Sequence, residues 1–167
     1  MSHLFTPLPI GKLELENRII IAPMCQYSAV NGKFTAWHDM HLGNLAQSGA
    51  GLLIIEATAI EPEGRITYGD VGLWDDETEA ALGKTITAVR SHSDMPIAIQ
   101  LAHAGRKASC EKPWDGGGAI APDHKNGWQV VAPSTVPFRA GDPEPEALST
   151  SRIREIVQSF ADAAKRA

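Results

Sequence analysis

The sequence predicts an α/β fold built on a parallel sheet. Three near-continuous apolar runs of strand length alternate along the chain with segments whose apolar residues recur at helical spacing. Strands that are apolar along their whole length are typical of parallel sheets, because helices cover them. The order strand, helix, strand, helix, strand, helix therefore indicates a parallel sheet covered by helices.

The first elements are a small hairpin and a short strand. Residues 5–18 alternate loosely between apolar and polar side chains and contain two prolines and a glycine as turn residues, which predicts a hairpin or an extended cover. A strand is expected over Ile19–Met24, stopped by Pro23. A helix is expected over Trp37–Gln47, followed by the glycine-rich stop at residues 48–51.

The second strand is expected over Leu52–Ile60, and a helix follows it. Asp75 or Asp76 can cap this helix, whose first turn is acidic. Its apolar residues lie on one face, at i, i+4 and i+7: Leu82, Ile86 and Val89.

The third strand, Ile97–Ala104, begins after Pro96. The following stretch, Gly105–Leu148, is rich in Gly, Pro, Asp and Trp and is expected to be irregular. Ser149 or Thr150 can cap a final helix. This helix carries one apolar stripe: Ile153, Ile156, Val157, Phe160 and Ala164.

Two layouts fit this order, an open doubly wound sheet and a (β/α)8 barrel. An open nucleotide-binding sheet favours a glycine fingerprint after the first strand, where this chain has Ala-Pro-Met-Cys instead. The run Gly116–Gly118 follows no strand and is expected to be flexible loop. The last helix is still periodic at Ala167 without a cap, and a whole barrel takes roughly 250 residues. The chain is therefore expected to be part of a larger unit.

Composition excludes several classes of function. The net charge of −5 argues against a nucleic-acid or anionic-membrane surface, and no apolar run approaches the length of a membrane span. Residues 1–18 lack the apolar core of a signal peptide, so the cytoplasm is expected. Cys25 and Cys110 are expected to be free thiols, and without a Cys-x-x-Cys pair a structural zinc site is not expected.

Polar side chains follow each predicted strand. The first strand leads into Met24–Tyr27, the second carries Glu56, and the third carries Gln100 and ends near His103. Parallel α/β enzymes place their chemistry at the carboxyl ends of the strands, so these residues predict a ligand site. Gln100 stands among apolar residues, where a buried carboxamide needs several partners that a heterocycle could supply.

Each of these residues also has a structural interpretation. Cys25 is compatible with a small buried hydrophobe, and Tyr27 with packing. Glu56 is more readily explained as a buried acid tied to an arginine or to backbone amides, and His103 as a structural hydrogen-bonding group. His38 and His41 lack an evident third metal ligand, so a surface or helix-packing role is favoured for both. Trp114 and Trp128 could cap a pocket or pin the long loop, and the sequence does not distinguish these roles.

The motifs resemble those of the Old Yellow Enzyme family of flavin-dependent ene-reductases, specifically its thermophilic-like branch. The matching segments are LFTPLPIGKLELENRIIIAPMCQY, SGAGLLIIEATAIEPEGRIT, GLWDDE, IAIQLAHAGRKAS and APS, which extend over essentially the whole chain. A cysteine after Pro-Met, with a tyrosine two residues on, marks this branch, since other branches usually carry threonine at the cysteine position.

The resemblance implies the N-terminal half of a (β/α)8 TIM barrel with an N-terminal hairpin, comprising strands 1–3 and holding FMN at the strand ends. NAD(P)H would reduce the flavin, which would then pass hydride to an activated alkene. The implied cofactor-binding residues are Ala22, Pro23, Met24, Cys25, Ala57 and Gln100. Cys25 would also tune flavin redox behaviour, and Tyr27 would contact the substrate. Arg106 and Lys107 match a motif near the site.

The family's substrate-gripping histidine pair, proton-donating tyrosine, flavin arginine and phosphate-binding loops belong to later strands, which this sequence does not contain. The resemblance therefore implies activity only with a complementary C-terminal half as partner. A non-catalytic half-barrel that self-associates into an oligomer is the alternative, because three strands cannot close a barrel. Another FMN barrel reductase, such as a dihydroorotate dehydrogenase, fits the motifs less well.

Overall fold

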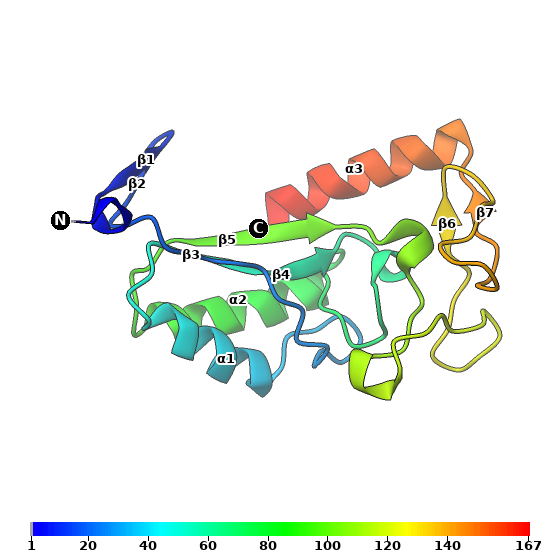
Figure 1. Cartoon of the computed structure of the whole chain (residues 1–167), viewed down its shortest axis with the longest axis horizontal. Coiled ribbons are helices and arrows are strands. Elements are labelled where there is room, and N and C mark those ends of the chain that lie inside the picture. Colours follow the sequence, from blue (N-terminus) through cyan, green and yellow to red (C-terminus); the bar gives the residue numbers. More distant parts are fainter. Residues whose placement is uncertain (1) are drawn as a thin grey trace.

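The computed structural model describes residues 2–167 and centres on a three-stranded parallel sheet (Figure 1). Strand β4 (Leu52–Ala59) lies between β3 (Ile20–Ile21) and β5 (Ile97–Ala102). Ile20 pairs with Leu52, and Leu53 pairs with Ile97. The predicted parallel sheet and its strand order along the chain are therefore confirmed.

Two helices cover one face of this sheet. Helix α1 (Ala36–Ala46) connects β3 to β4, and α2 (Asp76–Arg90) connects β4 to β5. The core between these layers contains buried residues of both helices and of β4: Leu42, Ala46, Leu53, Ile55, Leu82 and Val89. The helical spacing seen in the sequence predicts this buried face correctly, because residues three and four apart share one side of a helix.

The start of α2 is stabilised by a local capping box. The Asp75 carboxylate accepts a hydrogen bond from the Thr78 backbone N–H at 2.8 Å, and the Thr78 hydroxyl lies 3.1 Å from the Asp75 backbone N–H. This reciprocal arrangement satisfies donors that the first turn of a helix leaves without partners.

Replacing this cap is expected to weaken folding modestly. Asp75→Ala should lower the free energy of unfolding by about 1 kcal/mol, because the Thr78 N–H loses its acceptor. Urea unfolding followed by circular dichroism measures the change. The exposed Asp94 is a matched control, and an equal loss in Asp94→Ala would contradict the assignment.

The N-terminal hairpin and the last helix lie outside this two-layer unit. Strands β1 (Leu8–Ile10) and β2 (Leu13–Leu15) pair antiparallel beyond the amino ends of the sheet strands (Figure 1). Helix α3 (Thr150–Arg166) begins at its N-cap Ser149 and runs alongside β5. Arg166 binds Asp76 and Glu79 in the first turn of α2.

Short elements connect the larger ones. In the described residues, 3-10 helices occur at His3–Phe5, Pro62–Gly64, Gly105–Lys107 and Pro113–Asp115. Strands β6 (Val131–Ala132) and β7 (Glu146–Ala147) pair in parallel inside the stretch that was expected to be irregular. That stretch is therefore partly ordered by long-range backbone hydrogen bonds. None of the helices in residues 2–167 is long and apolar enough to cross a membrane.

The structure corrects two further expectations. The first strand is limited to Ile20–Ile21 rather than Ile19–Met24, since Pro23 has no backbone N–H to pair with β4. On α3 the buried residue is Ala163, whereas Ala164 is exposed. Most of the predicted apolar stripe of α3 is solvent-exposed, with Val157 at 63%.

Candidate functional site

The carboxyl ends of the three parallel strands meet at one edge, as the common direction of the β4 and β5 arrows in Figure 1 shows. Residues 22–27 continue from β3 along this edge. Ala57 and Gln100 are direct neighbours across β4 and β5. The fold therefore brings together the strand-end residues that the sequence singled out.

Gln100 is exposed, whereas the sequence predicted a buried carboxamide. The side of the sheet that carries Gln100 has no covering helix, while its neighbour Leu101 packs against the core. Within residues 2–167 the Gln100 carboxamide makes no hydrogen bond. Its donors and acceptor are thus available to a ligand that lies over the small side chain of Ala57.

Cys25 is half-buried and close to the same neighbours. Burial raises the pKa of its thiol to about 12, and the negative charges of Asp70 and Glu56 add to this effect. The backbone amides of Ala57 and Cys25 offset it only in part. The thiol is therefore protonated at neutral pH, and both cysteines are free, as the sequence predicted.

Tyr27 adopts a left-handed backbone conformation, with φ of 51°. Non-glycine residues rarely adopt this conformation, and it is often found at functional sites. The Trp114 ring packs edge-on against Tyr27, with ring centroids 5.7 Å apart. Burial raises the pKa of the Tyr27 hydroxyl, and the nearby carboxylates of Asp70 and Glu56 add to this effect.

A cavity of about 370 Å³ opens beside Tyr27. Its lining combines apolar and charged side chains from the long loop, including Lys107, Cys110, Phe138 and Arg139. A larger cavity, of about 730 Å³, lies at the opposite edge of the sheet, lined by residues such as Glu14, Gly51 and Met95. Of the two cavities, the one at Tyr27 is the candidate ligand site, because ligands of parallel α/β folds bind at the carboxyl ends of strands.

Glu56 lies at a β-bulge in the middle of β4. The pairing with β5 shifts between Ile55 and Ala57, so Glu56 has no partner across the sheet. Its buried carboxylate accepts a hydrogen bond from the Gln26 backbone N–H at 2.8 Å. Burial raises the pKa of Glu56 to about 7, and the bond from Gln26 offsets this in part. A backbone amide, rather than an arginine, is thus its partner.

The two helix histidines have packing roles in the described residues. His38 is buried, and burial lowers its pKa to about 4. The His41 ring stacks on Trp37, with ring centroids 6.4 Å apart. No group of three or more His, Cys, Asp or Glu residues suited to a metal occurs within residues 2–167.

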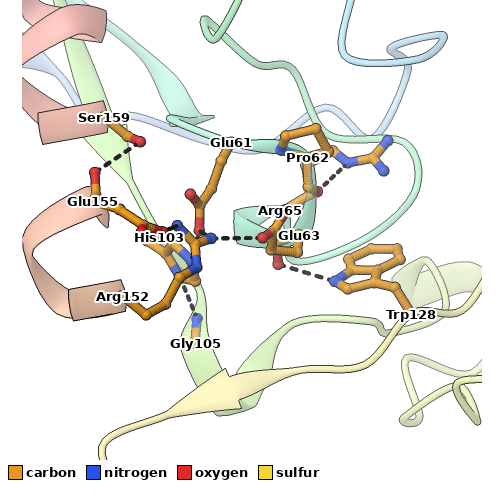
Figure 2. Close-up of polar contacts among 10 residues, drawn as sticks. All are labelled: Glu61, Pro62, Glu63, Arg65, His103, Gly105, Trp128, Arg152, Glu155 and Ser159. Carbon is orange, nitrogen blue, oxygen red and sulfur yellow. Dashed lines mark hydrogen bonds and ion pairs between the residues drawn. The ribbon is translucent and has the colours of Figure 1, made fainter. Parts of the chain in front are cut away.

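A partly buried ion-pair network lies beyond the ends of β4 and β5 (Figure 2). Glu61 accepts from the Arg152 guanidinium at 2.7 Å and lies 2.7 Å from His103 Nε2. Arg152 also binds Glu63 at 2.6 Å. This network connects the ends of β4 and β5 to the first turn of α3. The structural interpretation of His103 is thereby confirmed.

The long loop is held by side chains that the sequence left unassigned. Trp128 donates from Nε1 to the Glu63 carbonyl at 2.9 Å, so this tryptophan pins the loop (Figure 2). Arg106 donates to the Val136 carbonyl at 2.7 Å. Arg106 therefore fastens the loop, while Lys107 lies over the Phe138 ring at 5.2 Å.

Sequence reasoning missed Asp70. The buried Asp70 accepts hydrogen bonds from Ile66 N–H at 2.8 Å and from the Thr67 hydroxyl at 2.7 Å. Its charge raises the pKa of Cys25 from a loop that is distant in sequence. The spacing of Thr67 and Asp70 is typical of a side-chain-stabilised turn, but it carries no signal that this turn faces Cys25.

The model of a known protein family matches residues 3–167 of this chain. The matching family is described as the NADH:flavin oxidoreductase / NADH oxidase family. An NADH:flavin oxidoreductase of Gibberella zeae is 46% identical over 99% of this chain and 41% of its own length. An NADPH dehydrogenase of Bacillus cytotoxicus is 40% identical over 99% of this chain and 43% of its own length.

Solved protein structures include a reductase with a similar fold. Morphinone reductase in complex with tetrahydroNAD superposes with a TM-score of 0.78 and 32% sequence identity. The match extends over 99% of this chain and 46% of that protein. The chain thus spans less than half the length of the relatives it matches.

Proposed function

This chain belongs to the NADH:flavin oxidoreductase / NADH oxidase family, the Old Yellow Enzyme family that its motifs resemble, and we propose that it supplies half of an FMN-dependent ene-reductase. Its fold is that of the first half of a (β/α)8 barrel with an N-terminal hairpin. The observation that carries the proposal is the exposed Gln100 carboxamide beside Ala57, next to the protonated thiol of Cys25.

The residues at this edge fit FMN. Gln100 offers both a donor and an acceptor without an internal partner, which matches the polar edge of an isoalloxazine ring. Ala22 and Ala57 are small enough to let the ring approach the backbone. Pro23 and Met24 would line the ring, and Met24 is 67% exposed at this edge.

When bound, FMN supplies hydride transfer from NAD(P)H to the β-carbon of an activated alkene, such as an α,β-unsaturated carbonyl compound. In this proposal the Cys25 thiol acts as a neutral, polarisable group beside the ring and tunes its redox behaviour. Tyr27 contacts the alkene, and the cavity beside Tyr27 receives the rest of that substrate.

The proposal includes a complementary C-terminal half as partner. Three exposed apolar regions support it: the uncovered sheet edge with Met24, the α1 residues Trp37 and Met40, and the α3 residues Ile153, Val157 and Phe160. Groups of exposed apolar side chains on a soluble protein often mark surfaces that a partner covers. Covering these regions would also close the edges of β3 and β5.

The test combines this chain with a C-terminal fragment equivalent to the remaining length of its relatives. We expect the mixture with FMN to oxidise NADPH in the presence of 2-cyclohexenone, and each piece alone to show no turnover. Folded pieces that associate and bind FMN without turnover would refute the proposed activity. A flavin-free homodimer of this chain would favour the alternative, a non-catalytic half-barrel.

The role of Gln100 can be tested by flavin titration of the same mixture. Gln100→Leu is expected to weaken FMN binding about tenfold, or about 1.4 kcal/mol, because the polar edge of the isoalloxazine ring loses its hydrogen-bond partner. Quenching of flavin fluorescence measures the dissociation constant. Gln47→Leu, an exposed glutamine at the end of α1, is the matched control and should leave the constant unchanged. Equal constants for both variants would exclude Gln100 from the flavin site.

A further inference from the structure

The bulge at Glu56 connects the sheet to the segment Cys25–Tyr27. Residues Ile55 and Ala57 pair on either side of the bulge, and Ala57 lies beside the exposed Gln100. The Glu56 side chain instead reaches Gln26 and lies near His38 of α1, which packs on the opposite face of the sheet. The bulge therefore directs the Glu56 carboxylate toward Gln26 and helix α1, away from the sheet face that carries Gln100.

Each polar group of Gln26, in the backbone and in the side chain, makes a hydrogen bond. Its N–H donates to Glu56 at 2.8 Å, and its carbonyl accepts from the Ser28 hydroxyl at 2.9 Å. Its side chain bonds the Met24 carbonyl at 2.8 Å and the Trp37 indole N–H at 3.1 Å. Glu56 provides the one contact among these that comes from the sheet.

His38 presents a donor to the other oxygen of the same carboxylate. Its Nδ1 accepts from the Thr35 backbone N–H at 2.9 Å, so a neutral ring carries its proton on Nε2. His38 Nε2 lies 3.6 Å from Glu56 Oε1 and is the one buried side-chain nitrogen or oxygen in residues 2–167 without a hydrogen-bond partner. A displacement of a few tenths of an ångström would complete this hydrogen bond.

We infer that Glu56 and His38 form a positioning pair that holds Cys25 and Tyr27 in register with the edge of the sheet. His38 orients the carboxylate from α1, the carboxylate fixes the Gln26 amide, and this amide sets the turn between Cys25 and Tyr27. The inference rests on the proposed function only for the identity of the ligand, FMN, that would lie over that edge. It explains how Tyr27 keeps its left-handed conformation, since contacts on both sides of the turn hold it.

The pair has a second effect, on the charge around Cys25. The ionisable groups near Glu56 are His38, Cys25, Tyr27 and Asp70. His38 is neutral, and Arg65 offsets the charge of Asp70 but not that of Glu56. An ionised Glu56 therefore disfavours the Cys25 thiolate, in addition to the burial of the thiol. Position and charge can be separated by two substitutions of the same residue.

The experiment uses the full 167-residue chain at pH 8, without flavin, nucleotide or alkene. Hydrogen exchange at the Gln26 amide and alkylation of Cys25 by iodoacetamide are measured by mass spectrometry. Cys110 is the internal reference for alkylation. Glu61→Gln is the matched control, because Glu61 is also a buried carboxylate at the end of β4 but contacts His103 and Arg152 instead.

We expect Glu56→Ala to accelerate both Gln26 exchange and Cys25 alkylation at least about tenfold, because the amide loses its acceptor and the turn opens. Glu56→Gln retains an acceptor oxygen, so Gln26 exchange should stay within about threefold of the parent protein. Alkylation of Cys25 should still rise in Glu56→Gln, since the charge is gone. Glu61→Gln should change neither readout.

Unchanged exchange and alkylation in Glu56→Ala would overturn the inference, as would an equal change in Glu61→Gln. If Glu56→Ala does not fold, the isosteric Glu56→Gln still provides the test, because faster alkylation of Cys25 with a protected Gln26 amide is required. Neither readout depends on flavin or on turnover. Failure of the reductase assay would therefore be distinguishable from failure of this inference.

Discussion

Cys25 is expected to react with iodoacetamide about a thousandfold more slowly at pH 8 than a free thiol in water, because the thiolate is the reactive form. Burial and two nearby carboxylates raise the pKa of Cys25 from 9.0 to about 12. Each unit of this shift lowers the thiolate fraction about tenfold. Initial rates of Cys25 modification between pH 7 and pH 11 measure the effect.

The rate should keep rising to the top of this pH range without a plateau. A plateau near pH 9 would show an unperturbed thiol and would contradict the structure. Cys110 in the same sample controls for reagent stability and for global unfolding. Since the folded state holds the proton to about pH 12, the Cys25 contribution to stability is lost as pH rises above about 9. Cys25→Ser should remove this part of the alkaline destabilisation.

Arg152→Met is expected to lower the free energy of unfolding by about 2 kcal/mol, since it leaves the buried Glu61 carboxylate without its cation. Arg152 binds both Glu61 and Glu63 (Figure 2). The Glu61 side chain is 9% exposed, whereas the Arg152 side chain is 27% exposed. The expected loss is therefore smaller than that for a fully buried pair, because solvent screens part of the interaction.

Urea unfolding of Arg152→Met measures this loss, with Lys165→Met as the matched control. Lys165 pairs with Asp162 on the exposed surface of the same helix, where solvent screens the pair, so its loss should change stability little. Arg152→Lys should give an intermediate loss, because an ammonium group cannot bridge two carboxylates in the way a guanidinium does. Equal losses in the Arg152 and Lys165 variants would show that the network is not stabilising.

The elements of the fold could be predicted where the signal is local. The apolar runs that form β4 and β5 and the cap of α2 at Asp75 follow from neighbouring residues alone. The meeting of Ala57 and Gln100 at one edge follows from the general geometry of parallel strands. The length of the first strand was overestimated, because pairing partners rather than apolar character end it at Ile21.

The details of the site could not be predicted, because they depend on register and on contacts between distant segments. The bulge at Glu56 arises from the pairing of β4 with a strand about forty residues later, and no residue next to Glu56 signals it. The contact of Trp114 with Tyr27 joins segments nearly ninety residues apart. The exposure of Gln100 depends on which face of the sheet the helices cover.

The sequence by itself determined the order of strands and helices, the edge at which polar residues collect, and the motifs of a flavin-dependent family. These properties are set by periodicity, capping and residue type, which act over a few residues. Only the tertiary structure decided that Glu56 turns behind the edge to hold Gln26, and that Asp70 raises the pKa of Cys25. The physical reason is that hydrogen bonds, burial and charge act through space, between residues that the chain itself keeps apart.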